Sequence, residues 1–288
     1  MFRSLRHPNY RLWFFGYSIS LVGTWMQTMA QQVLVYRLTG SGAALGLINF
    51  IGLIPLLPLT LWGGSIADRF PKRKVILVVQ CVLLIQALLL AIFTWSGIIE
   101  VWHVYLLAFI MGAATAVDLP TRQAFTVEMV EGKEDLANAI GLNSAIFNGA
   151  RALGPAFAGI VVAATGEGTA FFINALTFLS VIASLLLMKN LPPVRSRAQG
   201  SSVTQHTLEG LHYVRKNRTL LILISLVAVS AFLSMPYNTV MPVFAETVLK
   251  DSARPVVESI CNTAVTGLHC QAPEALPLGF LLTMVGLG

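Results

Sequence analysis

The fold of this chain is decided by the stretch that joins two of its apolar runs, Gly64-Ser65-Ile66-Ala67-Asp68-Arg69-Phe70-Pro71-Lys72-Arg73-Lys74. The run before it is Ala44–Ala67 and the run after it is Val75–Trp95. A membrane-spanning helix uses about 20 predominantly apolar residues, and segments rich in Lys and Arg connect such helices on the cytoplasmic side. The stretch is therefore typical of a basic cytoplasmic turn between two membrane-spanning helices.

Apolar runs of similar length recur along the chain. Seven are long enough to span a membrane: Leu12–Tyr36, Ala44–Ala67, Val75–Trp95, Trp102–Val117, Ile140–Thr165, Thr169–Met188 and Thr219–Met241. An eighth run, Leu276–Gly288, is shorter than the roughly 17 residues that a span needs, so we expect an incomplete helix and a truncated chain. With 56% hydrophobic and 11% charged residues, the composition argues against a soluble enzyme, a disordered chain or a disulfide scaffold.

The basic residues are distributed unevenly between the connecting segments. Counted on alternate sides of the predicted spans, fifteen Lys and Arg lie on the side of the N-terminus, whereas the other side holds Arg37, Lys250 and Arg254. Cytoplasmic loops carry such an excess of Lys and Arg, which predicts a cytoplasmic N-terminus. The net charge of +6 is thus a signal of membrane topology and not of nucleic-acid binding.

The longest connecting segment divides the chain into parts. Residues 1–191 are predicted to form a six-helix transmembrane half, and residues 192–218 a cytoplasmic linker. Leu208, Leu211 and Val214 recur at helical spacing in this linker, which indicates a short amphipathic helix. Residues 219–288 would form part of a second half, with a seventh helix, an external loop and the start of an eighth helix. The sequence therefore predicts an all-α, polytopic transmembrane helical bundle.

The basic turn resembles the loop signature of the major facilitator superfamily, Gly-x-x-x-Asp-Arg-x-Gly-x-Arg-Arg/Lys. Five positions match in register, namely Gly64, Asp68, Arg69, Arg73 and Lys74, whereas Pro71 stands in place of the usual Gly. A glycine in such a helix allows a neighbouring helix to approach closely, and we expect this of Gly64. A carboxylate at the membrane edge is suited to an Arg partner or to a helix N-terminus, as we expect of Asp68.

A second motif lies in the fifth predicted span, Ala150-Arg151-Ala152-Leu153-Gly154-Pro155-Ala156-Phe157-Ala158-Gly159. It resembles the superfamily motif of exporting antiporters, with Arg151, Gly154, Pro155 and Gly159 as its candidate functional residues. Small residues at these intervals allow tight helix packing, and Pro155 is expected to bend the helix. An ordinary packing face with a kink is the alternative interpretation. Arg151 needs an acceptor, and both a structural pairing and a role in substrate or proton coupling remain open.

From residue 1 to about 249, the chain also resembles the enterobactin-exporter branch of the superfamily. This resemblance rests on segments such as Asp118-x-Pro120-x-Arg122-Gln123-Ala124-Phe125 and Asn138-Ala139-Ile140-x-Leu142-Asn143-Ser144. The resemblance implies a secondary transporter in the bacterial inner membrane, which exports a siderophore- or drug-like molecule by proton antiport and alternating access. Two alternatives stay open: a non-transporting fragment of such a transporter, and a membrane accessory subunit that needs a partner chain.

Polar residues inside the predicted spans are candidates for a substrate cavity, because polar groups are costly in hydrocarbon. Thr24, Gln27 and Gln31 fall on one face of the first predicted helix. They could line a cavity near the membrane midplane or form hydrogen bonds between helices. Asn143 and Asn148 of the fifth predicted helix are further candidates, with interhelical hydrogen bonding as the alternative.

Asp118 and Arg122 lie at the cytoplasmic end of the fourth predicted span, Trp102–Val117. If the helices pack as in the resembled family, an Asp68–Arg122 pair would be the latch of a cytoplasmic gate. We identify no Asp or Glu deep inside a predicted span, so the sequence does not assign the residue that carries the proton.

Other chemistry is sparsely indicated. Cys261 and Cys270 fall in the predicted external loop, where either a disulfide or two free thiols would be acceptable in an oxidising compartment. We find no metal-ligand spacing, P-loop, dinucleotide glycine pattern or HExxH motif, so we expect no enzymatic activity, no metal site and no cofactor. The expected partners are a small-molecule substrate, protons and the lipid bilayer.

Overall fold

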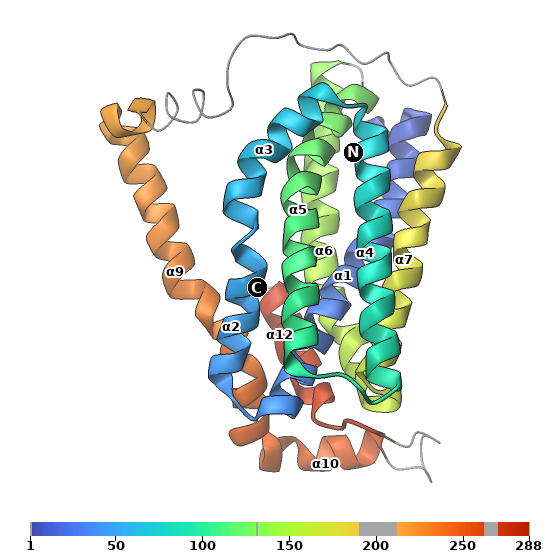
Figure 1. Cartoon of the computed structure of the whole chain (residues 1–288), viewed down its shortest axis with the longest axis vertical. Helices are drawn as coiled ribbons and strands as arrows, with labels where there is room; N and C mark the ends of the chain where they lie inside the picture. The colour runs from blue at the N-terminus through green and yellow to red at the C-terminus, as the bar shows by residue number, and fades with distance from the viewer. Residues whose placement is uncertain (1, 131, 190–211, 262–269, 288) are drawn as a thin grey trace.

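The computed structural model describes residues 2–130, 132–189, 212–261 and 270–287. Within these ranges the chain forms helices and no β-strand. The elements are η1 (Arg3–Arg6), α1 (Pro8–Thr39), α2 (Gly42–Leu53), α3 (Leu56–Arg69), α4 (Lys72–Trp95), α5 (Val101–Met129), α6 (Lys133–Thr165), α7 (Glu167–Leu187), α9 (Arg218–Thr247), α10 (Lys250–Ile260) and α12 (Ala275–Leu287). Figure 1 shows most of these helices running side by side, so the predicted all-α helical bundle is confirmed.

Several helices have the length and apolar character of membrane spans. Five segments of the described residues meet both criteria: Gly42–Thr60, Lys72–Trp95, Val101–Met129, Lys133–Thr165 and Glu167–Leu187. Helix α1 has 32 residues, which at about 1.5 Å per residue is more than a bilayer requires. Its mean hydropathy is lower because it carries several polar side chains, among them Gln27, Gln31 and Gln32. The chain is therefore a multi-pass membrane protein.

The second predicted span, Ala44–Ala67, is not one continuous helix. It consists of α2 and α3, which are interrupted at Ile54 and Pro55. Proline lacks the backbone N–H and its ring clashes with the preceding helical turn, so it breaks a helix at this point. The break lies against α5, because a Cβ added to Gly112 would come within 3.0 Å of the Pro55 ring.

The fourth predicted span, Trp102–Val117, ends too early. Helix α5 continues to Met129, and Asp118 is therefore enclosed within a membrane-length helix. No Asp or Glu lies deep inside a predicted span, because this predicted span ends at Val117. The sequence criterion ended the span at the first charge, whereas the structure buries this charge beside a basic residue four positions later, Arg122.

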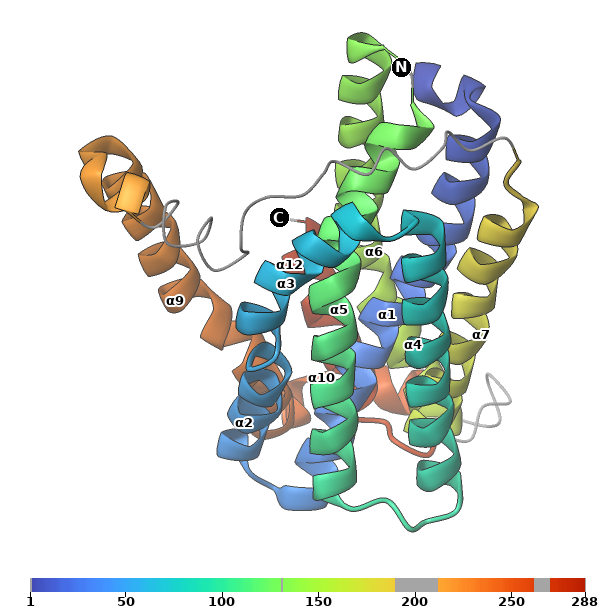
Figure 2. The same cartoon turned by 45° about the horizontal axis from the view of Figure 1, so that its top comes forward.

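The bundle has two ends that differ in their contacts. We call the end with η1 and the α3–α4 turn the basic end, and the opposite end the α10 end, where α10 lies across the bundle (Figure 1). Helix α12 packs mainly on α6, and α9 packs on α2. Figures 1 and 2 both show α9, in orange, diverging from the other helices toward the basic end. Residues 221–230 of α9 are accordingly exposed.

The apolar core follows the same division. One cluster lies toward the α10 end and joins α1, α2, α5, α6 and α12, with Leu34, Leu45 and Leu278 among its buried members. Another lies toward the basic end and includes Tyr10, Trp13 and Phe125. Both clusters draw on helices that are far apart in the sequence, so the bundle forms as a unit.

The predicted linker, residues 192–218, lies largely outside the described residues. Residues 212–216 are helical, and they include Val214 of the predicted amphipathic helix. Leu208 and Leu211 lie outside the described part of the chain. The division into a six-helix half, a linker and a partial second half therefore stays a prediction.

Candidate functional site

An ion pair lies buried inside the bundle near its basic end. Arg122 and Asp118, one turn apart on α5, form a salt bridge, and their side chains are 13% and 8% exposed. The guanidinium carbon of Arg122 lies 4.3 Å from the ring centroid of Tyr17 and 5.4 Å from that of Trp13, both on α1. Gln80 of α4 is also buried and lies beside the Asp118 carboxyl group. Three helices thus enclose one carboxylate and one guanidinium.

The local sequence explains why this pair forms. Residues four positions apart share one face of a helix, so the two side chains meet without a contribution from any other segment. Helix α1 contributes to the burial of the pair together with α4, and it is held against α5 by the Trp13 ring, which packs edge-on against Phe125 at a centroid distance of 5.7 Å. A buried ion pair of this kind is costly to desolvate, and removing either partner leaves the other uncompensated. Such a group in a membrane helix marks a functional site by default.

The predicted gate latch would join Arg122 to Asp68 of the loop motif. The side chains of residues 65–69 lie outside the part that is described, and this includes both Asp68 and Arg69. The described acidic partner of Arg122 is Asp118 on its own helix. The latch therefore stays a prediction.

The remaining basic residues of the loop motif have different surroundings. Lys72 pairs with Glu128 at 2.6 Å and thereby ties the start of α4 to the end of α5. The guanidinium of Arg73 donates a hydrogen bond to the carbonyl oxygen of Leu186 on α7. Lys74 is exposed and borders an apolar groove between α4 and α5. The motif thus connects α4 to two neighbours and leaves one lysine facing outward.

The close helix approach expected at Gly64 occurs one residue earlier. A Cβ added to Gly64 would meet no described atom within 4 Å. A Cβ added to Gly63 would lie 2.7 Å from the carbonyl oxygen of Ala116, which is backbone and cannot move aside easily. Gly63 is therefore the position where α3 packs on α5, and no local pattern in the sequence distinguishes it from Gly64.

The second motif forms a packing stripe on α6 that contacts two helices. A Cβ added to Gly154 would meet Trp25 and would lie 3.0 Å from the carbonyl oxygen of Val22, so this glycine faces α1. A Cβ added to Gly159 would lie 3.0 Å from the carbonyl oxygen of Ala275 and 3.1 Å from the Cα atom of Gly279. Gly159 therefore faces α12, and the two helix backbones approach closely there.

Pro155 lies between these two contacts. It is buried inside α6, and its carbonyl oxygen would lie 2.7 Å from a Cβ added to Gly279. The Nε atom of Arg151 is buried and has no hydrogen-bond partner in the described part of the chain. Both interpretations of Arg151 therefore stay open.

The polar face of the first helix is occupied chiefly by hydrogen bonds between helices. Gln27 of α1 is fully buried beside Gln86 of α4 and Asn174 of α7. Its Nε2 atom donates to Oε1 of Gln86 at 3.0 Å, and its Oε1 atom accepts from Nδ2 of Asn174 at 2.6 Å. Gln27 thus forms hydrogen bonds between helices, as one of its two interpretations expects.

Its two companions on α1 differ from it. Thr24 donates to the carbonyl oxygen of Ser20 at 2.9 Å, within its own helix. Gln31 is buried, and its Nε2 atom has no hydrogen-bond partner among the described residues. Gln31 is therefore the member of this face with free hydrogen-bonding capacity.

The two candidate asparagines on α6 are also separated. Asn143 accepts a hydrogen bond from the Tyr10 hydroxyl at 3.1 Å and approaches Thr126 of α5 at 3.5 Å. Asn148 is exposed and donates to the carbonyl oxygen of Ser144 in the preceding turn. Asn143 thus joins α1, α5 and α6, whereas Asn148 faces outward.

Replacing Gln27 with leucine is expected to lower the stability of the bundle. The change leaves the buried amide groups of Gln86 and Asn174 without their partner, and each unsatisfied buried group costs about 1–3 kcal/mol. Thermal unfolding of the purified protein in detergent measures the loss. Thr24→Val is the matched control, since it removes only a bond within α1. An equal loss of stability in both variants would contradict this interpretation of Gln27.

The α10 end carries contacts that the sequence did not single out. Nδ2 of Asn49 on α2 donates to Oγ1 of Thr239 on α9 at 3.1 Å, which joins the two predicted halves. Arg37 at the end of α1 pairs with Glu167 at the start of α7, at 2.9 Å. Neither pairing has a local signal, because the partners lie more than a hundred residues apart in the sequence.

The two cysteines of the predicted external loop lie beside α10. Cys261 and Cys270 are joined in a disulfide with their Cα atoms 5.4 Å apart. Residues 262–269 between them lie outside the described part of the chain. Beyond the disulfide, the backbone amide of Gln271 donates to the carbonyl oxygen of Ala163, which attaches this segment to the end of α6.

The helical bundle and its membrane-length segments match the architecture of the major facilitator superfamily. The chain belongs to the family described as transmembrane secretion effector, which it matches over residues 1–255.

Curated relatives agree with this assignment. The chain is 26% identical over 239 residues to the staphyloferrin A transporter of Staphylococcus aureus, an alignment that covers 82% of this chain and 59% of that protein. It is 23% identical over 247 residues to macrolide efflux protein A of Streptococcus pyogenes, covering 83% and 60% of the two chains. A macrolide efflux protein A of Enterococcus faecalis is 24% identical over 201 residues, covering 68% and 61%. The chain thus spans about 60% of the length of these relatives.

Proposed function

We propose that this chain takes part in the export of a siderophore- or macrolide-like small molecule across a bacterial plasma membrane. The transport would be secondary, driven by protons that move in the opposite direction. The observation that carries the proposal is the buried Asp118–Arg122 pair inside a membrane-length helix of a transporter family member. The relatives support a siderophore- or macrolide-like substrate, because one is named as a siderophore transporter and two as macrolide efflux proteins.

Asp118 is our candidate for the proton-carrying group. It is a buried carboxylate inside α5, and its partner Arg122 is held by the rings of Tyr17 and Trp13. Binding a proton would neutralise the carboxylate and release the guanidinium from its ion pair. The change would alter the contact between α5 and α1 and so couple proton binding to a movement of helices. No external cofactor is required for this step.

Alternating access provides the mechanism of transport. The described contacts between α9 and α2 lie at the α10 end, where Asn49 bonds to Thr239 and Gly42 meets Val243. Toward the basic end α9 diverges from the other helices (Figure 2). The arrangement supports a conformation that is closed at the α10 end. In secondary transporters the substrate binds near the bilayer midplane between the halves, and rocking of the halves exposes it to either side.

We propose that the basic end faces the cytoplasm, together with the N-terminus. Basic residues accumulate on the cytoplasmic side of membrane proteins, and η1, the α3–α4 turn and the start of α9 all carry them. With this orientation the conformation described here is open toward the cytoplasm. Residues 1–191 and the helices after residue 219 would act as the two moving parts.

The proposal is tested by transport into everted membrane vesicles that carry this chain and any further helices encoded by its gene. An acid interior is expected to drive accumulation of a macrolide or of a staphyloferrin-type siderophore. With one proton exchanged per substrate, a gradient of one pH unit sustains about tenfold accumulation. Vesicles without the protein are the control. Accumulation that persists after a protonophore collapses the gradient would contradict proton antiport, and absence of transport of both substrates would contradict the substrate class.

A further inference from the structure

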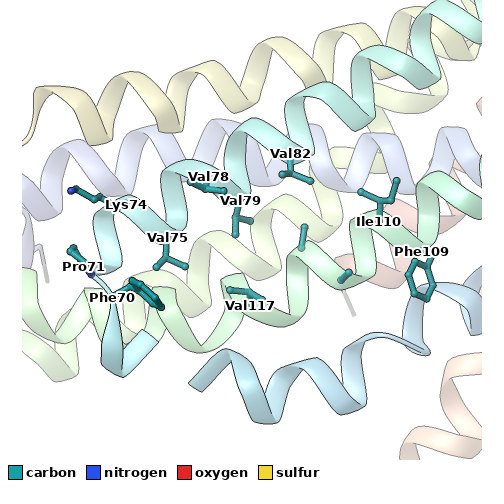
Figure 3. A pocket seen from close by; sticks show the side chains of 12 residues that line it. Phe70, Pro71, Lys74, Val75, Val78, Val79, Val82, Phe109, Ile110 and Val117 are labelled. Atoms are coloured by element: carbon teal, nitrogen blue, oxygen red, sulfur yellow. The ribbon is translucent and has the colours of Figure 1, made fainter. Parts of the chain in front are cut away.

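An apolar groove runs along the outside of the bundle between α4 and α5. It has a volume of about 530 Å³ and is walled by Val75, Val78 and Val82 of α4 and by Phe109, Ala113 and Val117 of α5. Figure 3 shows the labelled valines of α4 in a row beside Phe109, Ile110 and Val117 of α5. The α4 positions are three and four residues apart and the α5 positions are four apart, so each row occupies one face of its helix. The groove is therefore a continuous feature that follows the helix axes.

Packing explains why the groove exists. Helices α3 and α4 both pack on α5 but make few contacts with each other, so the surface of α5 between them stays uncovered. The small side chains of Ala113 and Ala114 lie on that surface and cannot fill it. Val78 and Phe70 are more than half exposed. The groove thus opens to the exterior of the bundle, which faces the hydrocarbon chains of the bilayer.

One end of the groove is positively charged. Phe70, Pro71 and Lys74 line it at the start of α4, and in Figure 3 the Lys74 nitrogen points away from the valines. Lys72 forms an ion pair with Glu128, and Arg73 donates a hydrogen bond to a carbonyl oxygen. Lys74, by contrast, has no acidic partner among the described residues. Long basic side chains at helix ends extend in this way toward the membrane surface.

The start of α4 adds a second attraction for an anion. Its N-cap residue, Pro71, makes no side-chain hydrogen bond to the helix, and the first turn contains no acidic residue. The N-terminal amide groups of a helix carry a partial positive charge and are a ready site for phosphate. This charge and that of Lys74 are directed to the same end of the groove.

We propose that the groove binds an anionic glycerophospholipid, with one acyl chain along the valine rows and the headgroup phosphate beside Lys74 and the start of α4. From Lys74 to Val82 the helix rises about 12 Å, which approaches the roughly 15 Å thickness of one hydrocarbon leaflet. The apolar lining fits an acyl chain, and the charged end lies where a headgroup lies. This lipid site is separate from the buried Asp118–Arg122 pair and does not depend on the proposed transport reaction.

Native mass spectrometry of the 288-residue chain in detergent tests the proposal, with phosphatidylglycerol and phosphatidylcholine as the two probes. We expect one retained phosphatidylglycerol per chain and weaker retention of phosphatidylcholine. Lys74→Gln should weaken phosphatidylglycerol binding about fivefold, since it removes one charge at the membrane surface. Ala113→Phe should weaken binding about tenfold, which corresponds to lost contact with about two methylene groups.

Matched controls separate this site from the general annulus of lipid. Lys133→Gln removes an exposed lysine at the start of α6, and Leu106→Phe enlarges an exposed side chain of α5 outside the groove. Both variants should bind phosphatidylglycerol as the parent chain does. The proposal is overturned if either groove variant binds like its control, or if both lipids are retained equally. A change in oligomeric mass caused by Ala113→Phe, without a change in lipid binding, would overturn it in favour of a protein partner.

Discussion

Replacing Gly159 with leucine is expected to reduce efflux by about fivefold or more. Even a Cβ atom at this position would lie 3.0 Å from the carbonyl oxygen of Ala275 and 3.1 Å from the Cα atom of Gly279. The obstacles are backbone atoms, so α6 and α12 must separate to accept a longer side chain. Overpacking of this kind costs about 1–3 kcal/mol, and a cost of 1.4 kcal/mol changes an equilibrium tenfold.

The proton-driven transport assay in vesicles measures the effect, with the amount of inserted protein determined in the same preparation. Gly141→Leu is the matched control, because Gly141 lies on the same helix and a Cβ there meets no described atom within 4 Å. It should transport at nearly the parent rate. If the two variants transport equally well, the contact between α6 and α12 has no part in the mechanism. The same change at the facing glycine of α12, Gly279→Leu, should cause a similar loss of transport.

Removal of the Asp118 carboxylate is expected to affect both stability and coupling. Asp118→Ala leaves the Arg122 guanidinium buried without its acidic partner, and breaking a buried ion pair from one side costs about 3–5 kcal/mol. The double variant Asp118→Asn with Arg122→Gln removes both charges, so it should recover most of this stability. Thermal unfolding in detergent measures these differences.

Transport assays then separate packing from coupling. The double variant should still exchange labelled for unlabelled substrate across the membrane, which needs no net proton movement, but should lose accumulation driven by a pH gradient. Glu258→Ala is the matched control. It removes the ion pair between Glu258 and Arg254 on α10, whose residues are also four positions apart but whose side chains are both more than 60% exposed. Exposed pairs of this spacing contribute about 0.3–0.5 kcal/mol. Proton-driven accumulation by the double variant would exclude Asp118 as the proton carrier.

The two mutational tests concern different parts of the bundle. Gly159 lies on the contact between α6 and α12, and Asp118 lies on α5 beside α1 and α4. Their effects should therefore be independent, as is usual for sites without shared partners. If Gly159→Leu abolished transport while leaving substrate exchange intact, the assignment of α6–α12 to the moving interface would need revision.

Membrane segments could be predicted from the sequence because hydropathy is a property of each segment by itself. Helices α4, α6 and α7 contain the predicted runs almost completely, and all-helical structure follows from the need to satisfy backbone hydrogen bonds in lipid. Boundaries were less accurate where a charge or a proline interrupts a run. The sequence criterion stopped at Asp118 although α5 continues, and it passed over Pro55 although the helix breaks there.

The site was less predictable than the segments. Gln27 was predicted to lie on a polar face of the first helix, but its partner Asn174 lies 147 residues away in the sequence. The rings of Trp13 and Tyr17 enclose Arg122, and no local pattern in α1 indicates that they do. Gly63 and Gly64 are adjacent glycines, and the contact with Ala116 distinguishes them.

What the sequence determined by itself is which segments enter the bilayer and which turns stay basic, since transfer of a segment into hydrocarbon depends on its own composition. What only the tertiary structure decided is which polar groups meet. Asp118 is enclosed because α1 and α4 pack against α5, and Gly159 is a close contact because α12 crosses α6 there. Such pairings depend on the rotation and height of one helix relative to another, and many residues far apart in the sequence determine these quantities together.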